Sequence, residues 1–248
     1  MAQINQYELK DYIPEVIAQT VRKRCGFGCV RCGCSVYHYH HFDPPFESAK
    51  GHNAEGITLL CPTCHQAAHK GILSRSTIED FNKNPYCLRE GFSQYAYDLE
   101  NLSEVILGTI TFIDNPKMIE AFGECLLQIE PPEELGSYPL LSAKFYDPSG
   151  KLIAKICRNV WYGNAENWDI KSEGKKVTIR EAIRKIVLIL RFEAPSRLVV
   201  EKINMFYKWL KIIGVEGEST KVYLPDGKLW FSTNHMRMIG NRHGIVLE

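Results

Sequence analysis

The 248-residue sequence lacks the features that would place it in a membrane or outside the cell. No stretch approaches about 18 consecutive apolar residues, so we expect no membrane-spanning helix. The first six residues contain no apolar run of the secretory type, which predicts a cytoplasmic protein. Internal repeats and low-complexity segments are absent as well. Together with a hydrophobic fraction of 45%, these absences favour an ordinary globular protein over a disordered one.

A large charge of one sign is also missing, because the net charge is only +1. The charges are nevertheless segregated: residues 1–75 carry a net +2, residues 76–147 carry −9 and residues 148–248 carry +8. Such blocks indicate distinct surfaces, and the basic C-terminal region is a candidate for contact with a polyanion. The alternative interpretation is an ordinary solvated surface.

Helix signals dominate the first hundred residues. Pro14 suits the first position of a helix over residues 13–24, whose apolar residues recur at helical spacing. A second proline, Pro62, opens a helix that ends before Gly71. The capping-box sequence Ser76-Thr77-Ile78-Glu79 predicts a third helix, which Asn84-Pro85 interrupts. We expect helical structure again over about residues 88–102.

Short β-prone runs begin at Glu104 and continue to the end of the sequence. The turn sequence Asp147-Pro148-Ser149-Gly150 separates two of them, and further turn signals recur about every ten residues. This spacing suggests a β-sandwich or a related all-β domain. We therefore predict an α+β protein: a first domain over residues 1–75, a helical connector over 76–103, and an all-β domain of unknown specificity over 104–248.

Six of the nine cysteines fall within residues 25–64. Four of these form two CxxC pairs, Cys29 with Cys32 and Cys61 with Cys64, and two such pairs make the usual ligand set of a structural zinc site. Cys25 and Cys34 lie close enough in sequence to substitute for a neighbouring ligand. The three remaining cysteines are expected in the core, as ordinary buried thiols: Cys87, Cys125 and Cys157.

Four histidines accompany these cysteines. His65 and His69 are four residues apart on the predicted helix, so their rings share one face and can share a metal ion. His40 and His41 are adjacent in a predicted strand and point to opposite faces. One of that pair can therefore bind the ion while the other faces a substrate. This division of roles suits a phosphodiesterase that uses one metal ion and a histidine base.

Residues 22–73 resemble an HNH (ββα-metal) endonuclease domain of the zinc-knuckle type. The similarity lies in the two CxxC pairs, in Tyr39-His40-His41-Phe42-Asp43-Pro44, and in the run from Ile57 to His65. The resemblance implies that His41 is the general base and that His40, His65 and His69 bind a catalytic divalent ion, Mg²⁺ or another. It also implies DNA as the substrate and products with 5′-phosphate and 3′-hydroxyl ends.

One motif position departs from the family. The middle asparagine of the motif, which braces the loop between the two strands, is replaced here by Gly56. Asn53, three residues earlier, is a candidate to take over the bracing. The alternative for the whole histidine set is a second structural metal site, or a nuclease fold that only binds DNA.

Several other residues carry weaker predictions. Basic side chains near the motif are candidates for contact with the backbone of double-stranded DNA: Arg22, Lys23, Arg24, Arg31 and Lys70. His38 and His52 are expected to be ordinary polar residues, with contact to a phosphate as the alternative. His235 and His243 are expected to be surface or core residues rather than ligands. Trp161, Tyr162 and Trp168 are expected to pack inside the β domain, although stacking on bases is an alternative.

The function predicted from the sequence is metal-dependent hydrolysis of DNA phosphodiesters, with structural Zn²⁺ and a catalytic divalent ion. By analogy only, a freestanding protein of this kind fits restriction or phage defence. The rival hypothesis is a non-catalytic zinc-binding module that recognises DNA or protein. A homodimer would favour double-strand cuts, but no pattern in the sequence supports one. The ligand or protein partner of the C-terminal domain stays unassigned.

Overall fold

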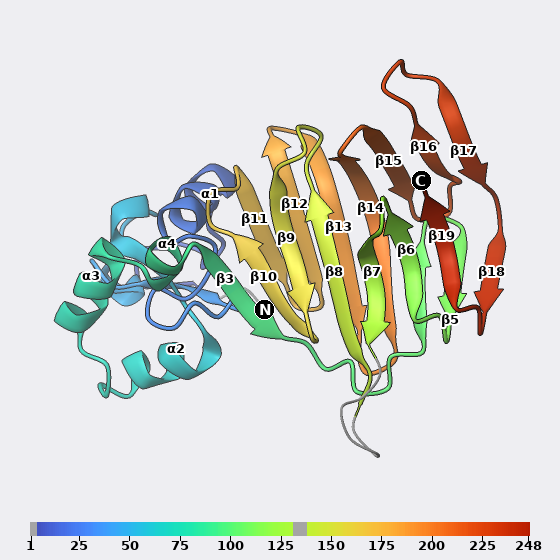
Figure 1. Cartoon of the computed structure of the whole chain (residues 1–248). Helices are drawn as coiled ribbons and strands as arrows, with labels where there is room; N and C mark the ends of the chain where they lie inside the picture. Colours follow the sequence, from blue (N-terminus) through green and yellow to red (C-terminus); the bar gives the residue numbers. More distant parts are fainter. Residues whose placement is uncertain (1–3, 131–137) are drawn as a thin grey trace. The chain divides into compact units, whose positions relative to one another are not determined.

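A computed structural model describes residues 4–130 and 138–248, and it shows a mixed α+β protein in which strands predominate (Figure 1). Residues 1–3 of the predicted first domain and 131–137 of the predicted β domain lie outside the described residues. The chain divides into two compact units. Unit 1 combines Met1–Tyr95 with Gly163–Ser172, and unit 2 combines Ala96–Tyr162 with Glu173–Glu248. No helix among the described residues is long and apolar enough to cross a membrane.

Unit 1 contains the helices and a small two-stranded sheet. Strand β1 pairs antiparallel with β2, and α2 follows directly after β2. The elements of this unit are α1 (Glu15–Arg24), β1 (His38–His41), η1 (Phe46–Ser48), η2 (Ala54–Gly56), β2 (Ile57–Leu60), α2 (Pro62–His69), α3 (Arg75–Lys83), α4 (Tyr86–Glu90) and most of β3 (Phe92–Ala96).

The core of unit 1 forms where α1 meets the two strands. Val21, Ile57 and Leu59 are fully buried there, together with two of the cysteines. All four residues of β2 are buried, because both faces of this short strand are covered. Strand β2 is therefore a fixed support for the helix that follows it.

The predicted helices over residues 13–24 and 62–70 are confirmed by α1 and α2. The third helix begins earlier than predicted, at Arg75, because Ser74 and not Ser76 caps it: the Ser74 hydroxyl accepts a hydrogen bond from the Thr77 backbone N–H at 3.2 Å. The helix expected over residues 88–102 is wrong. Helix α4 ends at Glu90, Gly91 takes a left-handed conformation, and β3 follows.

Unit 2 is built from strands, as the turn spacing predicted. Neighbouring strands in the two main sheets pair mostly antiparallel, whereas β4 with β14, β5 with β18 and β6 with β19 pair parallel. One sheet has the order β19-β6-β7-β8-β9-β10, and the other contains β12 through β17 in sequence order. Strand β11 belongs mostly to unit 1, which includes Gly163–Ser172. Figure 1 shows these sheets as two layers. The strands are β4 (Glu104–Leu107), β5 (Ile110–Ile113), β6 (Lys117–Ala121), β7 (Glu124–Glu130), β8 (Leu140–Tyr146), β9 (Leu152–Cys157), β10 (Val160–Asn164), β11 (Asp169–Glu173), β12 (Lys176–Ala182), β13 (Lys185–Glu193), β14 (Arg197–Tyr207), β15 (Leu210–Val215), β16 (Thr220–Tyr223), β17 (Leu229–Thr233), β18 (Met236–Ile239) and β19 (His243–Leu247).

Alternating burial along the strands locates the core of unit 2. In β8 every second residue is buried, which is the pattern of a strand with one face on a core and the other toward solvent. Trp161 is fully buried, so its predicted packing role is confirmed. Cys157 is exposed, so its predicted core position is wrong. Cys157 is the last residue of β9, and its side chain is on the exposed face of that strand.

Candidate metal centre

The two CxxC pairs come together in unit 1. The four sulfur atoms of Cys29, Cys32, Cys61 and Cys64 lie within 4.8 Å of one another, and only Cys32 is exposed. Cys61 caps the N-terminus of α2, where its sulfur accepts a hydrogen bond from the Cys64 backbone N–H at 3.4 Å. The cluster therefore joins the turn after α1 to the start of α2 and can hold a metal ion such as zinc.

The electrostatics of the cluster favour a bound cation. Hydrogen bonding from the Cys32 thiol, together with backbone N–H groups and against the effect of burial, lowers the pKa of Cys29 to about 5. Burial and the negative charge of Cys29 raise the pKa of Cys64 to about 12. One thiolate thus hinders the ionisation of its neighbours. A divalent cation at the centre removes this conflict, since it binds the thiolate forms.

The other cysteines do not join this group. The Cys34 sulfur contacts the Val36 carbonyl oxygen at 3.3 Å, and Cys25 is fully buried 3.6 Å from the Thr58 hydroxyl. Cys87 is also buried, as predicted, and Cys125 is half-buried. Of the two ligand sets left open by the sequence, the structure favours the paired CxxC set.

Three histidines form a second potential metal site. One ring nitrogen each from His40, His65 and His69 lies within 4.8 Å of the others. The Nε2 atoms of His65 and His69 are 3.3 Å apart, as expected for residues one turn apart on α2. His40 reaches the same point from β1, with its ring centroid 5.1 Å from that of His65.

Burial favours the neutral form of two of these imidazoles, those of His40 and His65. It lowers the pKa of His40 to about 4, and the neighbouring charges of His65 and His69 add to the shift. Burial and the charge of His69 likewise lower the pKa of His65 to about 4. Neutral imidazoles have a free lone pair at neutral pH, which is the form that binds a metal ion.

His41 lies outside this trio and has a different partner. Its Nε2 atom is 3.0 Å from Nδ1 of His52, and its ring centroid is 5.3 Å from that of Phe46. Burial, helped by the charge of His52, lowers the pKa of His41 to about 4. Sequence reasoning missed this contact and predicted an ordinary polar residue at His52, because no regular spacing joins the two histidines, which are 11 positions apart. His38 also approaches the site, with its ring 5.3 Å from that of His65.

Gly56 performs its structural role through its backbone. Its carbonyl oxygen accepts hydrogen bonds from the backbone N–H groups of Phe42 at 2.9 Å and Asp43 at 3.2 Å. A Cβ atom at this position would lie 1.7 Å from the Asp43 carbonyl oxygen, so no side chain fits. Asn53 closes the adjacent turn: its side chain accepts a hydrogen bond from Glu55 N–H, and its carbonyl accepts one from Gly56 N–H.

The basic candidates divide by exposure. Arg22 is fully buried, with its guanidinium bound to Asp169 and Glu15, so we withdraw it from the residues expected to contact DNA. Arg24 is half-buried and donates to the carbonyl oxygens of Ala54 and Ile57. The three exposed side chains are Lys23, Arg31 and Lys70.

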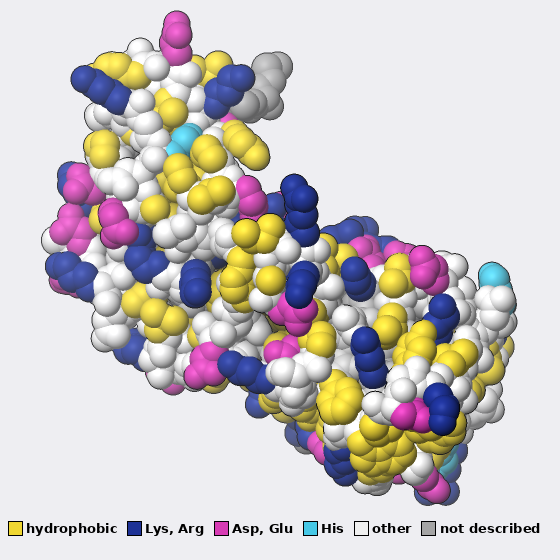
Figure 2. Space-filling model, turned by 90° about the horizontal axis from the view of Figure 1, so that it is seen from above, with side chains coloured by type: hydrophobic (Ala, Val, Ile, Leu, Met, Phe, Trp, Pro, Cys, Tyr) yellow, Lys and Arg dark blue, Asp and Glu magenta, His cyan; other side chains and the backbone are white. Residues whose placement is uncertain are grey.

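Lys23 lines a shallow hollow on α1. This hollow has a volume of about 400 Å³ and is also lined by Gln19, Thr20, Arg24 and the half-buried Trp168. Figure 2 shows that positive and negative side chains are mixed on the face in view, rather than gathered into one basic field.

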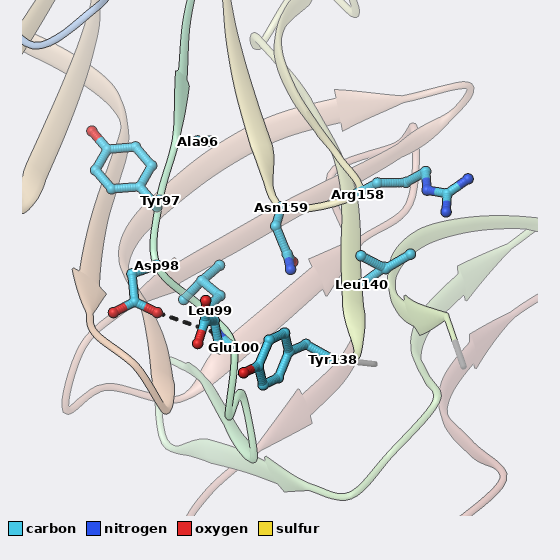
Figure 3. Close-up of a pocket in the computed structure, with 9 residues that line it drawn as sticks. All are labelled: Ala96, Tyr97, Asp98, Leu99, Glu100, Tyr138, Leu140, Arg158 and Asn159. Carbon is cyan, nitrogen blue, oxygen red and sulfur yellow. Dashed lines mark hydrogen bonds between the residues drawn. The ribbon is translucent and has the colours of Figure 1, made fainter. Parts of the chain in front are cut away.

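Unit 2 has a hollow of its own, with a volume of about 550 Å³ (Figure 3). Its lining mixes the carboxylates Asp98 and Glu100 with the cation Arg158 and the ring of Tyr138. This mixture selects no class of ligand. The two histidines of unit 2 belong to neither metal cluster: His235 is exposed, and His243 is beside Glu120 at 3.4 Å.

Comparisons with models of protein families, with curated proteins and with solved structures gave no match for this chain.

Proposed function

We propose that this protein is an HNH endonuclease that hydrolyses DNA phosphodiester bonds. The observation that carries the proposal is the convergence of His40, His65 and His69 within 4.8 Å, with His41 adjacent on the same strand. These histidines lie on a strand–strand–helix unit, which is the arrangement that the resemblance to ββα-metal nucleases implies. The four-cysteine cluster supports the proposal, because zinc there would fix the start of α2 and so the direction of His65 and His69.

Each histidine has a defined part in the proposed mechanism. His40, His65 and His69 would hold a divalent ion, Mg²⁺ or another, which when bound supplies positive charge for the scissile phosphate and the leaving 3′-oxygen. His41 points to the other face of β1 and accepts a proton from the attacking water. Its low pKa keeps it unprotonated at neutral pH. The resemblance implies products with 5′-phosphate and 3′-hydroxyl ends.

In the proposed mechanism His52 is a positioning residue, because it sets the tautomer of His41. For His41 to accept a proton at Nδ1, its Nε2 atom must carry hydrogen and donate to Nδ1 of His52, which is 3.0 Å away. This tautomer leaves the Nδ1 lone pair of His41 free for water. When His41 becomes protonated, the hydrogen bond to His52 gains charge assistance and stabilises the imidazolium.

The exposed cations Lys23, Arg31 and Lys70 are the candidates to hold the DNA backbone. They would contribute affinity without sequence preference. The rival function is a zinc-binding module that recognises DNA or protein without cutting. The clustered histidines favour the nuclease, because a recognition module has no need for a second group of metal ligands.

Plasmid cleavage tests the proposal. Purified full-length protein is incubated with supercoiled plasmid and Mg²⁺, Mn²⁺ or Ni²⁺, with EDTA as a control. We expect nicking by the wild type and a loss of roughly 100-fold or more in His41→Ala, the usual effect of removing a general base. The melting temperature of His41→Ala should stay close to that of the wild type. Equal nicking by the two proteins with every metal would refute the proposal.

The role of His52 has a separate test. We expect His52→Ala to lower the turnover rate while leaving the KM for plasmid unchanged, because the side chain acts on His41 and not on DNA. His52→Asn retains a hydrogen-bond acceptor and should recover part of the rate. His38→Ala is the control, since His38 is another histidine beside the site, but its ring lies against that of His65 and not against that of His41. Equal rates for all three variants would remove His52 from the mechanism.

A further inference from the structure

Three aromatic side chains gather on the surface of unit 2, outside its core. Phe122 lies in the turn between β6 and β7, Trp209 in the turn between β14 and β15, and Trp230 on β17. The ring centroids of Phe122 and Trp209 are 4.8 Å apart, and those of Trp209 and Trp230 are 6.3 Å apart. We call these three residues the aromatic platform.

Neither the core nor the turns require these rings. Trp209 is 39% exposed, Trp230 is 43% exposed, and Phe122 is half-buried. Phe122 and Lys208 both have positive φ, a conformation that asparagine or glycine adopts more readily than a bulky residue. The geometry of the two turns therefore does not explain why Phe122 and Lys208 occupy these positions.

A cation accompanies the platform. The ammonium group of Lys208 is 5.0 Å from the ring centroid of Phe122 and 5.6 Å from that of Tyr207. Among the described residues, Lys208 forms no salt bridge. The charge of Lys208 helps to lower the pKa of Glu124, but that carboxylate already pairs with Lys144 and accepts a hydrogen bond from Tyr207. Positive charge therefore remains available beside the rings.

The chemistry and the size of the aromatic platform indicate which kind of ligand it can bind. Flat aromatic rings beside a cation suit nucleobases joined to phosphate. A free nucleotide would need a pocket that encloses most of its surface, whereas these rings lie on turns and on a terminal strand of a sheet. A second protein copy would need about 800 Å² per partner. Trp209 and Trp230, each exposed by about two-fifths, provide roughly 120–200 Å², and the half-buried Phe122 adds less than either.

We propose that the aromatic platform binds an unpaired stretch of nucleic acid, with bases stacked on Trp209 and Trp230 and a phosphate beside Lys208. This binding site goes beyond the proposed cleavage of DNA and does not depend on it. It would direct the protein to substrates that contain single-stranded regions.

Fluorescence polarisation with the full-length His41→Ala protein tests the platform without cleavage. The probe is a labelled oligothymidine of about 12 nucleotides, within the range that one single-strand site covers. We expect Trp209→Ala and Trp230→Ala each to weaken binding roughly 5- to 100-fold, the usual effect of losing one stacking ring. Tyr138→Ala is the matched control, because Tyr138 is an aromatic residue of unit 2 that is 49% exposed and lies outside the platform.

Lys208→Asn tests the phosphate contact and keeps a residue that tolerates positive φ. The slope of log affinity against log salt should fall by about 0.7, the value for one phosphate contact on a single strand. If circular dichroism shows that an alanine variant does not fold, Trp209→Phe and Lys208→Asn test the proposal in its place. Trp209→Phe should retain most of the binding, and Lys208→Asn should change the salt dependence of the affinity.

Three results would overturn the proposal. These are no binding by the parent protein, equal affinity in the platform and control variants, or tryptophan variants that only dissociate a dimer in size-exclusion chromatography. The last result would identify a second copy as the occupant. Because no cleavage is measured, a failure of the nuclease proposal would leave these readings unchanged.

Discussion

Gly56 shows at the scale of one residue how a backbone group can replace a side chain. Its carbonyl oxygen accepts hydrogen bonds from both Phe42 and Asp43, and this ties the loop after β1 to the turn before β2. The backbone approaches so closely that a Cβ atom would meet the Asp43 carbonyl oxygen at 1.7 Å. The loop that carries His52 is thus braced through the backbone of Gly56, without an asparagine side chain at that position.

Restoring the motif asparagine should therefore harm the protein. We expect Gly56→Asn to lower the free energy of unfolding by about 3 kcal/mol or more, because the contact is with backbone that cannot rotate away. Gly51→Asn is the matched control, since a Cβ there would meet nothing within 4 Å. Urea denaturation of both variants measures the difference. If Gly56→Asn were as stable as Gly51→Asn, the bracing described for Gly56 would be wrong.

Residues joined by local spacing were predictable from the sequence, and residues joined by a loop were not. The pairs Cys29–Cys32 and Cys61–Cys64 each share one tight turn, and His65 and His69 share one helix face, so spacing alone brought these residues together. His52 meets His41 only because the chain of residues 42–56 folds back on itself. No periodic pattern describes such a loop.

At the scale of the element, α2 links the two metal sites. Cys61 caps its N-terminus and belongs to the cysteine cluster, while His65 and His69 extend from the same helix. A loss of metal from the cysteines should therefore disturb the histidines one and two turns away.

Cys61→Ser separates the capping role from the metal role, because serine is a good N-cap but a poor zinc ligand. We expect this variant to lose bound zinc and much of the stability that a structural site supplies, about 10–16 kcal/mol for a small zinc domain. Zinc content and thermal melting measure both effects. Cys157→Ser, at an exposed cysteine outside the cluster, is the control. Full zinc content and an unchanged melting curve in Cys61→Ser would contradict the four-cysteine site.

Elements with strong local signals were predicted well, and one without them was not. Helices α1 and α2 begin beside prolines and have clear apolar spacing, and both form as expected. Over residues 88–102 the prediction of a helix failed, because Gly91 ends α4 and the following residues join a sheet. Pairing with distant strands overrides a weak local preference for helix.

At the scale of the whole molecule, a short segment far along the chain completes unit 1. Gly163–Ser172 belongs to that unit, and its Asp169 binds the fully buried guanidinium of Arg22 at 2.9 and 3.0 Å. Although burial opposes it, this pairing raises the pKa of Arg22, so the side chain stays charged. Because the two partners are 147 positions apart, no local pattern in the sequence predicts the contact.

Removing the carboxylate should be costly. We expect Asp169→Ala to lower the free energy of unfolding by about 3–5 kcal/mol, because Arg22 would then be a buried charge without its main partner. Lys171→Ala removes a more exposed ion pair with Glu15 from the same segment and should change stability by about 1 kcal/mol or less. Urea denaturation compares the two. Equal losses would show that the segment acts through its backbone and not through Asp169.

The same ion pair predicts how unit 1 behaves when it is separated from the rest of the chain. A shortened chain that ends at Tyr95 contains every cysteine and histidine of the two metal clusters but lacks Asp169. We expect it to bind zinc weakly and to melt at a much lower temperature than the full-length protein, because the buried charge of Arg22 would lack the carboxylate of Asp169.

Replacing the charge of Arg22 with an apolar side chain of similar length should relieve this defect, so Arg22→Met should raise the melting temperature of the shortened chain. In the full-length protein the same substitution leaves Asp169 buried without its partner, so it should be destabilising there. If Asp169 completes the core of unit 1, Arg22→Met should therefore raise the melting temperature of the shortened chain and lower that of the full-length protein. Thermal melting in the presence of zinc measures both changes. A shortened chain that melts like the full-length protein, or an Arg22→Met effect of the same sign in both, would show that unit 1 folds without that segment.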